Sequence, residues 1–304
     1  MCVGGVVADR VVRLVAPPVT GTSNPGSVVS SPGGVARNVA ENLARLGLRP
    51  TLVSVIGDDT VGTSLVTGVR AAGADARGVR TIASESTAEY VAILDPDGEL
   101  VLGVAIMAVL DSLEPADVDA AWPPAATTGW IVLDCNPPPD VLVHTLARAQ
   151  ADAAGAHLVV VAVSAPKIAR LPARLDGVDI LFCTREEARA WLAGPGGRGD
   201  SFDASDSSLA SWLREAGASR VVLTLGAGGA LAASARGEVE IPSEPVRVVD
   251  VTGGGDALVA GTVAALVEGT DFEAAVRRGV HLAGLTVAVP GAVRPDLAAA
   301  VQAG

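Results

Sequence analysis

Residues 248–257 read Val-Val-Asp-Val-Thr-Gly-Gly-Gly-Asp-Ala and lead into a segment rich in alanine, leucine and valine. A β-branched run ends in three glycines and a carboxylate, and the segment that follows reads as a helix. Three consecutive glycines let backbone N–H groups converge on an anion, because no Cβ atom blocks close approach. The positive N-terminal end of the following helix would hold a phosphate from a second side. The motif therefore predicts an anion site at the start of a helix.

Asp256 is the unusual residue of this motif, because a carboxylate beside a bound anion is repelled by it. A carboxylate in that place can take the proton from a hydroxyl group as the hydroxyl attacks a phosphoryl group. The alternative is a glycine-rich turn in which Asp256 is an ordinary acidic residue in the first turn of a helix. Taken alone, the residues leave both interpretations open.

The composition restricts the partners and the compartment. A net charge of −12 disfavours a surface for nucleic acid or for anionic membranes. No apolar run reaches the roughly 18 residues needed to span a bilayer. The chain enters a β-type run with no basic leader, and its three cysteines (Cys2, Cys135, Cys183) are widely spaced. We therefore expect a cytoplasmic protein with reduced, buried cysteines.

Two common phosphate-binding motifs are missing from the sequence. Lys167 is the only lysine, and it follows Ala-Pro rather than the glycine that a P-loop requires. Residues 226–229, Gly-Ala-Gly-Gly, lack the spacing of the dinucleotide fingerprint. Any phosphate must be held by backbone amides, Mg²⁺ or a few arginines.

The histidines have no metal-ligand partners at suitable spacing, and we expect structural or surface roles for His144, His157 and His281.

Short β-branched runs alternate with helical stretches along most of the chain, which predicts a mostly parallel sheet with helices on both faces. Residues 10–31 and 87–110 break the alternation, and together they predict a small β-sheet lid. Residues 194–208 read as a surface loop. We expect strands at Thr51–Ile56, Gly129–Asp134, His157–Val163, Val178–Phe182 and Arg220–Leu225, and helices at Val35–Leu46, Thr60–Ala72, Val141–Ala154, Arg185–Leu192 and Ser207–Ala216.

Two motifs near the N-terminus have the chemistry of a polyol site. Residues 3–9 read as a strand that ends in an acid, and residues 32–38, Pro-Gly-Gly-Val-Ala-Arg-Asn, open a helix. Glycines before a helix let a sugar lie against the backbone, and Asp9 and Asn38 can hydrogen-bond paired hydroxyl groups. A plain turn followed by a polar first-turn residue is the alternative.

Two later motifs have the pattern of a nucleotide site. Residues 221–230 read as strand, glycine turn and strand, beside which a phosphate or ribose can pack. An ordinary glycine hairpin explains them equally well. Residues 184–188, Thr-Arg-Glu-Glu-Ala, follow a strand and start a helix. A capped helix with acids in its first turn explains this second motif without any function.

The order of these motifs over nearly the whole chain resembles the ribokinase (PfkB-type) family of carbohydrate and nucleoside kinases. The C-terminal signature of that family runs D-T-x-G-A-G-D, and residues 250–256 match it with Val251 and Gly254 as departures. Its N-terminal signature, a double glycine followed by an asparagine helix, is matched by residues 33–47. The resemblance implies a single ribokinase-like domain over residues 1–304. It also implies a three-layer α/β sandwich with a mostly parallel central sheet and the small sheet as lid.

The resemblance assigns a role to each motif position and implies ATP and Mg²⁺ as cofactors. The resemblance also allows, but does not require, a K⁺ site near Asp250 and residues 288–293. The family's Asn-x-x-Glu motif falls on Thr184–Glu187, so that threonine replaces asparagine while the glutamate is kept, with an indirect role at the metal. The implied positions are Asp256 as base with Gly253, Gly254 and Gly255 as anion hole; Asp9, Asn24, Gly33, Gly34, Asn38 and Lys167 for the substrate; Thr184, Thr224, Gly226, Gly229 and Thr252 for ATP; and Glu187 for the metal.

Within the family, the pseudouridine kinase branch is the most similar, through residues 22–26, 32–47 and 163–167. This likeness implies transfer of the γ-phosphoryl group of ATP to the 5′-hydroxyl of pseudouridine. Where that branch carries Asn-Asp-Met, residues 105–107 read Ala-Ile-Met, which removes polar groups that could recognise a uracil-like base. A kinase for another nucleoside or a simple sugar stays open, as does a non-catalytic binding protein. We expect a small-molecule substrate, no nucleic-acid or membrane partner, and a homodimer through the exposed lid edges.

Overall fold

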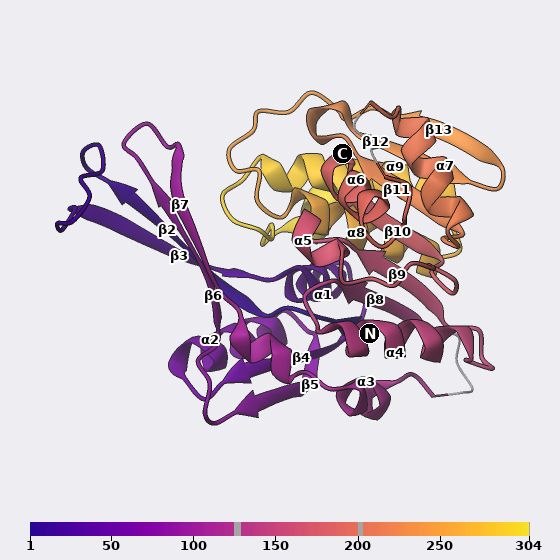
Figure 1. Cartoon of the computed structure of the whole chain (residues 1–304), viewed down its shortest axis with the longest axis horizontal. Helices are drawn as coiled ribbons and strands as arrows, with labels where there is room; N and C mark the ends of the chain where they lie inside the picture. The colour runs from indigo at the N-terminus through magenta and orange to yellow at the C-terminus, as the bar shows by residue number, and fades with distance from the viewer. Residues whose placement is uncertain (125–128, 200–202, 304) are drawn as a thin grey trace.

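The computed structural model describes residues 1–124, 129–199 and 203–303. A nine-stranded sheet forms the centre of the described chain, and its strands are parallel except for β12 and β13, which extend one edge antiparallel (Figure 1). Across the sheet the strands are β13 (Gly237–Ile241), β12 (Ala230–Ser234), β11 (Arg220–Thr224), β10 (Ile180–Thr184), β9 (His157–Val161), β8 (Trp130–Asp134), β1 (Cys2–Val3), β4 (Thr51–Gly57) and β5 (Asp75–Ile82).

Helices cover both faces of this sheet, which confirms the predicted three-layer α/β sandwich. One face packs against α1 (Val35–Arg45), α2 (Thr60–Ala71), α8 (Gly254–Val267) and α9 (Phe272–Val287). The other face packs against α3 (Pro115–Ala121), α4 (Pro139–Gln150), α6 (Arg185–Ala193) and α7 (Asp206–Glu215). The remaining short elements are α5 (Ala165–Ile168), α10 (Leu297–Ala303) and the 3₁₀ turns Ala108–Ser112 and Gly226–Gly228.

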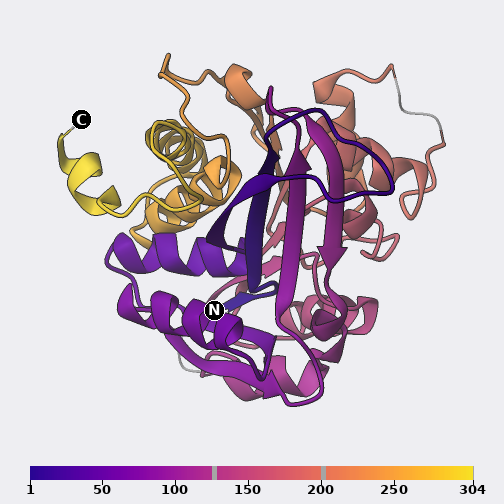
Figure 2. The same ribbon diagram turned by 90° about the vertical axis from the view of Figure 1, so that its left-hand side faces the viewer.

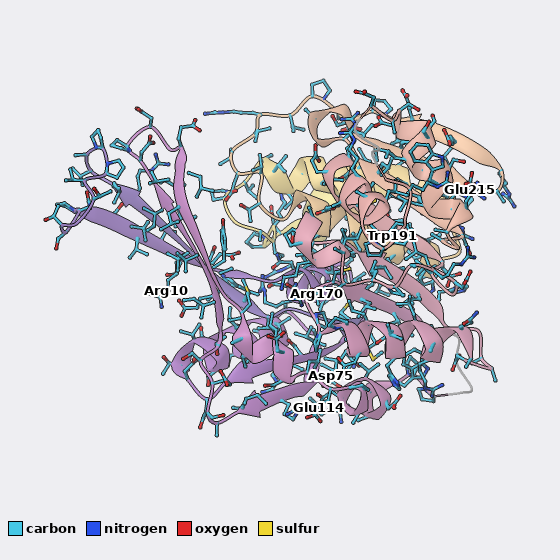
Figure 3. The ribbon with its side chains drawn as sticks, viewed as in Figure 1. Arg10, Asp75, Glu114, Arg170, Trp191 and Glu215 are labelled. Atoms are coloured by element: carbon cyan, nitrogen blue, oxygen red, sulfur yellow. The ribbon has the colours of Figure 1, made fainter. Side chains whose placement is uncertain are left out.

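Alternating side chains divide the core between the two faces. In β9, Leu158 and Val160 join one cluster of buried side chains, whereas Val159 and Val161 join the other. This two-residue period follows from the pleat of a strand that is buried on both faces. Trp191 of α6 is fully buried in the layer that α6 shares with α7 (Figure 3). Among the described helices, none is long and apolar enough to cross a membrane.

A separate four-stranded sheet projects from the body (Figures 1 and 2), and its presence confirms the predicted small sheet. Its first predicted segment begins three residues earlier than expected, at Val7, and β7 is exposed along its whole length. In spatial order, its strands are β3 (Gly26–Gly33), β2 (Val7–Leu14), β6 (Ala88–Leu94) and β7 (Leu100–Ile106).

The expected single strand over residues 3–9 is wrong. The run breaks at Gly4 and Gly5, so that β1 belongs to the central sheet and β2 to the small sheet. Gly4 has a φ of 147°, and a Cβ atom there would lie 2.2 Å from the Asp134 carboxylate, so only glycine fits at the break. Of the predicted loop 194–208, residues 200–202 lie outside the described residues, and α7 already begins at Asp206.

Candidate active site

The glycine motif forms the start of α8. Gly253 adopts a left-handed backbone with a φ of 76°, and a Cβ atom there would lie 1.9 Å from the carbonyl oxygen of Ala292. No described side chain caps this helix, so its first N–H groups are free to bind an anion. The Asp250 carboxylate accepts hydrogen bonds from the backbone N–H groups of Thr252 (2.9 Å) and Gly291 (3.0 Å). The first bond is local to the motif, and the second holds the motif against the C-terminal loop.

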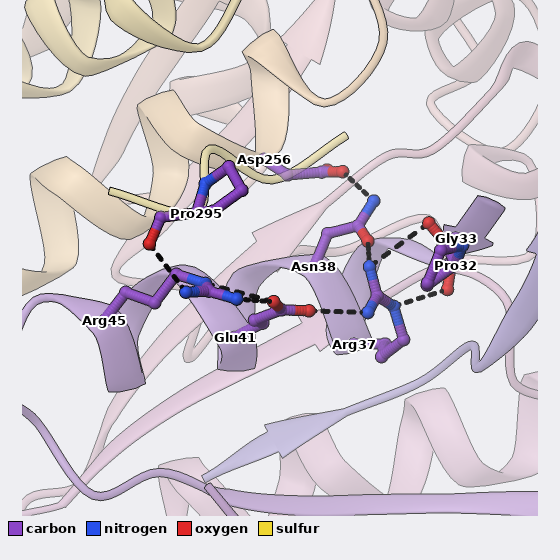
Figure 4. Close-up of polar contacts among 8 residues, drawn as sticks. All are labelled: Pro32, Gly33, Arg37, Asn38, Glu41, Arg45, Asp256 and Pro295. Carbon is purple, nitrogen blue, oxygen red and sulfur yellow. Dashed lines mark hydrogen bonds and ion pairs between the residues drawn. The ribbon is translucent and has the colours of Figure 1, made fainter. Parts of the chain in front are cut away.

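Asp256 lies in the first turn of α8, and Nδ2 of Asn38 donates a hydrogen bond to its Oδ2 at 2.7 Å (Figure 4). The pKa of Asp256 is raised to about 7, mainly by burial, and the charges of Asp134 and Asp9 act in the same direction. The Asn38 hydrogen bond and the charge of Arg37 oppose this rise. A carboxylate that titrates near neutrality is suited to accept a proton from a hydroxyl group.

The predicted sugar-side residues meet where β2, β3 and α1 come together. A Cβ atom on Gly33 would lie 2.1 Å from Oδ2 of Asp9, so the Asp9 carboxylate lies directly over this glycine. Gly34 has a φ of 93°, and a Cβ atom there would lie 2.4 Å from the carbonyl oxygen of Gly5. In the described parts of the chain, the Asp9 carboxylate has no hydrogen bond or ion pair, which leaves its oxygens available to hydroxyl groups.

Asp134 is a buried residue of this region that the sequence did not indicate. It ends β8, and its carboxylate accepts hydrogen bonds from the backbone N–H groups of Gly5 (2.9 Å), Ala36 (2.9 Å) and Asn136 (2.8 Å). These bonds anchor the turn after β1 and the first turn of α1 to the central sheet. The available signal was an acid at the carboxyl end of a fully apolar strand.

Arg37 is the second residue that sequence reasoning missed. Its side chain is only 2% exposed, and it lies beneath Asn38 in ion-pair contact with Glu41 at 2.6 Å. Charged residues at positions 37, 41 and 45 have the spacing of a solvated helix face. Arg37 and Glu41 are buried instead, and Arg45 donates a hydrogen bond to the carbonyl oxygen of Pro295 in the C-terminal loop.

A cavity of about 860 Å³ opens beside the glycine motif. Its size suits a ligand as large as a nucleotide. Gly254 and Gly255 form part of its wall, and apolar residues such as Val246 and Leu258 form much of the remainder. Four of the predicted nucleotide positions line the cavity, namely Thr184, Thr224, Gly226 and Gly229.

Thr184 and Glu187 form a capping box at the start of α6. Oγ1 of Thr184 accepts the backbone N–H of Glu187 at 3.2 Å, and Oε2 of Glu187 accepts the backbone N–H of Thr184 at 2.7 Å. This is the local structure that the helix-cap interpretation predicts. Within residues 1–124, 129–199 and 203–303, no group of three or more His, Cys, Asp or Glu side chains could hold a metal ion.

Neither of the other two predicted substrate residues, Asn24 and Lys167, is hydrogen-bonded to Asp9, Asn38 or Asp256. Asn24 is in the exposed loop between β2 and β3, and its amide is bonded to the backbone of Val19 and Thr22. Lys167 is half-buried on α5, and its ammonium group has no hydrogen bond or ion pair with a described residue. Burial lowers the pKa of Lys167, and the charge of Arg170 lowers it further.

Comparisons with known proteins extend over nearly the whole chain. Residues 1–299 match the profile of the pfkB family of carbohydrate kinases. Pseudouridine kinase from Escherichia coli (strain K12) is 31% identical over 282 residues, which cover 91% of this chain and 87% of that protein. A carbohydrate kinase from Agrobacterium tumefaciens superimposes with a TM-score of 0.80 at 30% identity, covering 99% and 94% of the two chains. Ribokinase from Arabidopsis thaliana, solved with ribose and ATP, has the same fold (TM-score 0.81, 20% identity, 99% and 96% covered).

Proposed function

The chain belongs to the pfkB family of carbohydrate kinases and is a phosphotransferase that acts on an alcohol group. From this premise we propose that it phosphorylates the 5′-hydroxyl of a nucleoside, with pseudouridine as the preferred acceptor. One observation carries the proposal: the hydrogen bond between Asn38 and Asp256 brings the sugar-side helix against the carboxylate at the glycine loop. The 31% identity to a pseudouridine kinase supports the choice of acceptor.

In this proposal, Asp9 and Asn38 bind ring hydroxyl groups of the acceptor and orient its primary hydroxyl toward Asp256. The Asp256 carboxylate accepts the hydroxyl proton while the hydroxyl oxygen bonds to the γ-phosphorus and the bond to the leaving ADP breaks. The free N–H groups at the start of α8 stabilise the charge on the transferred group. Gly253 is required there because its backbone passes within contact of Ala292.

We place ATP in the cavity beside the glycine motif, where Thr224, Gly226 and Gly229 form one wall. Mg²⁺ usually binds through one or two carboxylates together with phosphate oxygens, so it needs no preformed cluster of acids. Glu187, next to the cavity-lining Thr184, is the residue to which we assign an indirect role at this metal. When bound, Mg²⁺ neutralises the phosphates. A K⁺ ion beside Asp250 belongs to the same proposal, and comparing turnover in KCl and NaCl tests it.

A second candidate, another nucleoside or a simple sugar, is favoured by the lining of the small sheet. Ala105 pairs with Tyr90, and Tyr90 pairs with Asp9, so these three residues share one face of that sheet. This face therefore offers a base the hydroxyl of Tyr90 beside the apolar Ala105, with the Ser31 hydroxyl two strands away beside Asp9. A substrate that needs fewer polar contacts than pseudouridine would fit such a face.

We further propose that residues 1–304 form one domain in which the small sheet closes as a lid over the acceptor and excludes water. Apolar side chains on the opposite face of this sheet, such as Leu102, favour a homodimer through the lid. The three free, buried cysteines fit a cytoplasmic location. Neither nucleic acid nor a membrane has a part in the proposal.

The proposal is tested by measuring ATP turnover with Mg²⁺ and K⁺ against pseudouridine, uridine, cytidine, adenosine, ribose and fructose. We expect kcat/KM to be highest for pseudouridine. A higher kcat/KM for another acceptor would support kinase activity but would favour the second candidate substrate over pseudouridine. Binding of nucleosides without any acceptor-dependent turnover would contradict the kinase proposal and favour a non-catalytic binding protein.

A further inference from the structure

The buried guanidinium of Arg37 is held by groups of its own neighbourhood (Figure 4). Its Nε donates to the carbonyl oxygen of Gly33 at 3.0 Å, and Nη2 donates to that of Pro32 at 3.2 Å. On the other side of the fork, Nη1 donates to Oε2 of Glu41 at 2.6 Å. The planar fork is therefore fixed between the end of β3 and the first turns of α1, where it has no freedom to turn.

The same Nη2 atom also donates to Oδ1 of Asn38. An amide side chain presents an acceptor oxygen on one side and donor N–H groups on the other. Because the oxygen faces Arg37, the nitrogen faces Asp256 and donates to it at 2.7 Å. The reversed amide would place its oxygen against the carboxylate and its N–H groups against the guanidinium, and both contacts are repulsive.

We propose that Arg37 is a positioning residue for the phosphoryl-transfer step: it sets the orientation of the Asn38 amide, and the amide in turn holds the Asp256 carboxylate in place to accept the proton of the acceptor hydroxyl. The bonds to Pro32 and Gly33 tie this arrangement to the end of β3, where the chain leaves the small sheet for α1. The inference rests on the proposed role of Asp256 as base.

Arg37 also balances the charge around Asp256. The charged groups that affect the pKa of Asp256 are Arg37 of α1, Asp9 of β2 and Asp134 of β8. Of these, only Arg37 is positive. If its charge is removed, the carboxylate faces two negative neighbours, and a higher pH is needed to ionise it.

The test compares pH–rate profiles of the wild type and three variants on the acceptor that the panel identifies. Arg37→Met should lower kcat about tenfold near neutral pH and move the acidic limb of the profile up by about one pH unit, with the KM for ATP unchanged. Arg37→Lys keeps the charge but loses the fork, so kcat should fall while the limb stays in place. Arg80→Met is the matched control, because Arg80 binds Asp117 through two nitrogens far from this cluster. It should leave the profile unchanged.

A wild-type kcat and profile in folded Arg37→Met would overturn the inference. So would a fall in thermal stability without a change in the profile, because a merely structural arginine behaves in that way. If Arg37→Met does not fold, the double variant Arg37→Met/Glu41→Leu replaces the buried pair by apolar side chains and takes its place. If that variant does not fold either, Arg37→Lys decides: an unchanged kcat contradicts the inference. A wild type without acceptor-dependent turnover contradicts the proposed function instead.

Discussion

At the scale of single residues, the Asp256 carboxylate titrates near neutrality, so both the activity and the stability of the protein should depend on pH in this range. The pKa of Asp256 is about 7, against an ordinary value of 3.8, because of burial. For activity, the ionised form is the base, so kcat/KM of the wild type should rise through about pH 7. For stability the sign is opposite: the folded state holds the proton more tightly than the unfolded chain, so this residue's contribution to the free energy of unfolding falls between pH 3.8 and about 7.

Asp256→Asn separates the two effects. Turnover near neutral pH should fall by a factor of about 10² to 10⁴, the usual contribution of a general base. The free energy of unfolding at pH 8 should rise, because the partly buried charge is gone while the amide oxygen still accepts the Asn38 hydrogen bond. Steady-state kinetics and urea unfolding at pH 5 and pH 8 measure both, with the exposed Asp97→Asn as control. Retained turnover would contradict the mechanism.

The sequence allowed some of the functional side chains to be identified, but not others. Asp9, Asn38 and Asp256 belong to motifs whose chemistry could be read from their neighbours, and the structure places them in one region. Arg37 could not be identified, because its role depends on the contact of Asn38 with Asp256 of α8, which no local pattern encodes. Asn24 was assigned through resemblance, and its amide is bonded within its own loop.

At the scale of elements, two glycines at the start of α8 differ in their steric demands. Gly253 needs its left-handed φ of 76° and has no room for a Cβ atom, whereas a Cβ atom on Gly255 would meet no atom within 4 Å. We expect Gly253→Ala to lower the free energy of unfolding by about 1–3 kcal/mol. Gly255→Ala should raise it by up to about 1 kcal/mol, because alanine is the better helix former. Thermal unfolding of both variants tests this, and an equal effect would contradict the steric argument.

The strands of the central sheet and the helices that cover its two faces were the easiest elements to predict. The strand expected at Arg220–Leu225 is Arg220–Thr224, and the helix expected at Thr60–Ala72 is Thr60–Ala71, because apolar runs and turn residues bound them closely. The division of residues 3–9 between two sheets could not be predicted. It depends on Asp134, more than a hundred residues away, which accepts the N–H of Gly5.

At the scale of the whole molecule, the small sheet leaves one apolar face uncovered. Val28, Val12, Ile93 and Leu102 form a row across its four strands, on the face opposite Asp9. The side chains of Leu102 and Val28 are 53% and 58% exposed, and leaving this apolar surface in contact with water is unfavourable for a monomer.

If a second copy covers this face, Leu102→Glu should convert the dimer to a monomer by placing a charge in the contact. Sedimentation velocity over a range of concentrations measures the change. Val143→Glu is the matched control, since Val143 is similarly exposed at 47% but lies on α4. A wild type that sediments as a monomer at every concentration would contradict the dimer.

The hydrogen bond from Asn38 to Asp256 joins residues 218 positions apart. Contacts of such long range form late in folding, because the closure of a long loop has to be compensated by many other contacts. A ribosome must therefore deliver the chain through Asp256 before the base meets its partner. During refolding, the recovery of phosphoryl transfer should lag behind the recovery of far-ultraviolet circular dichroism.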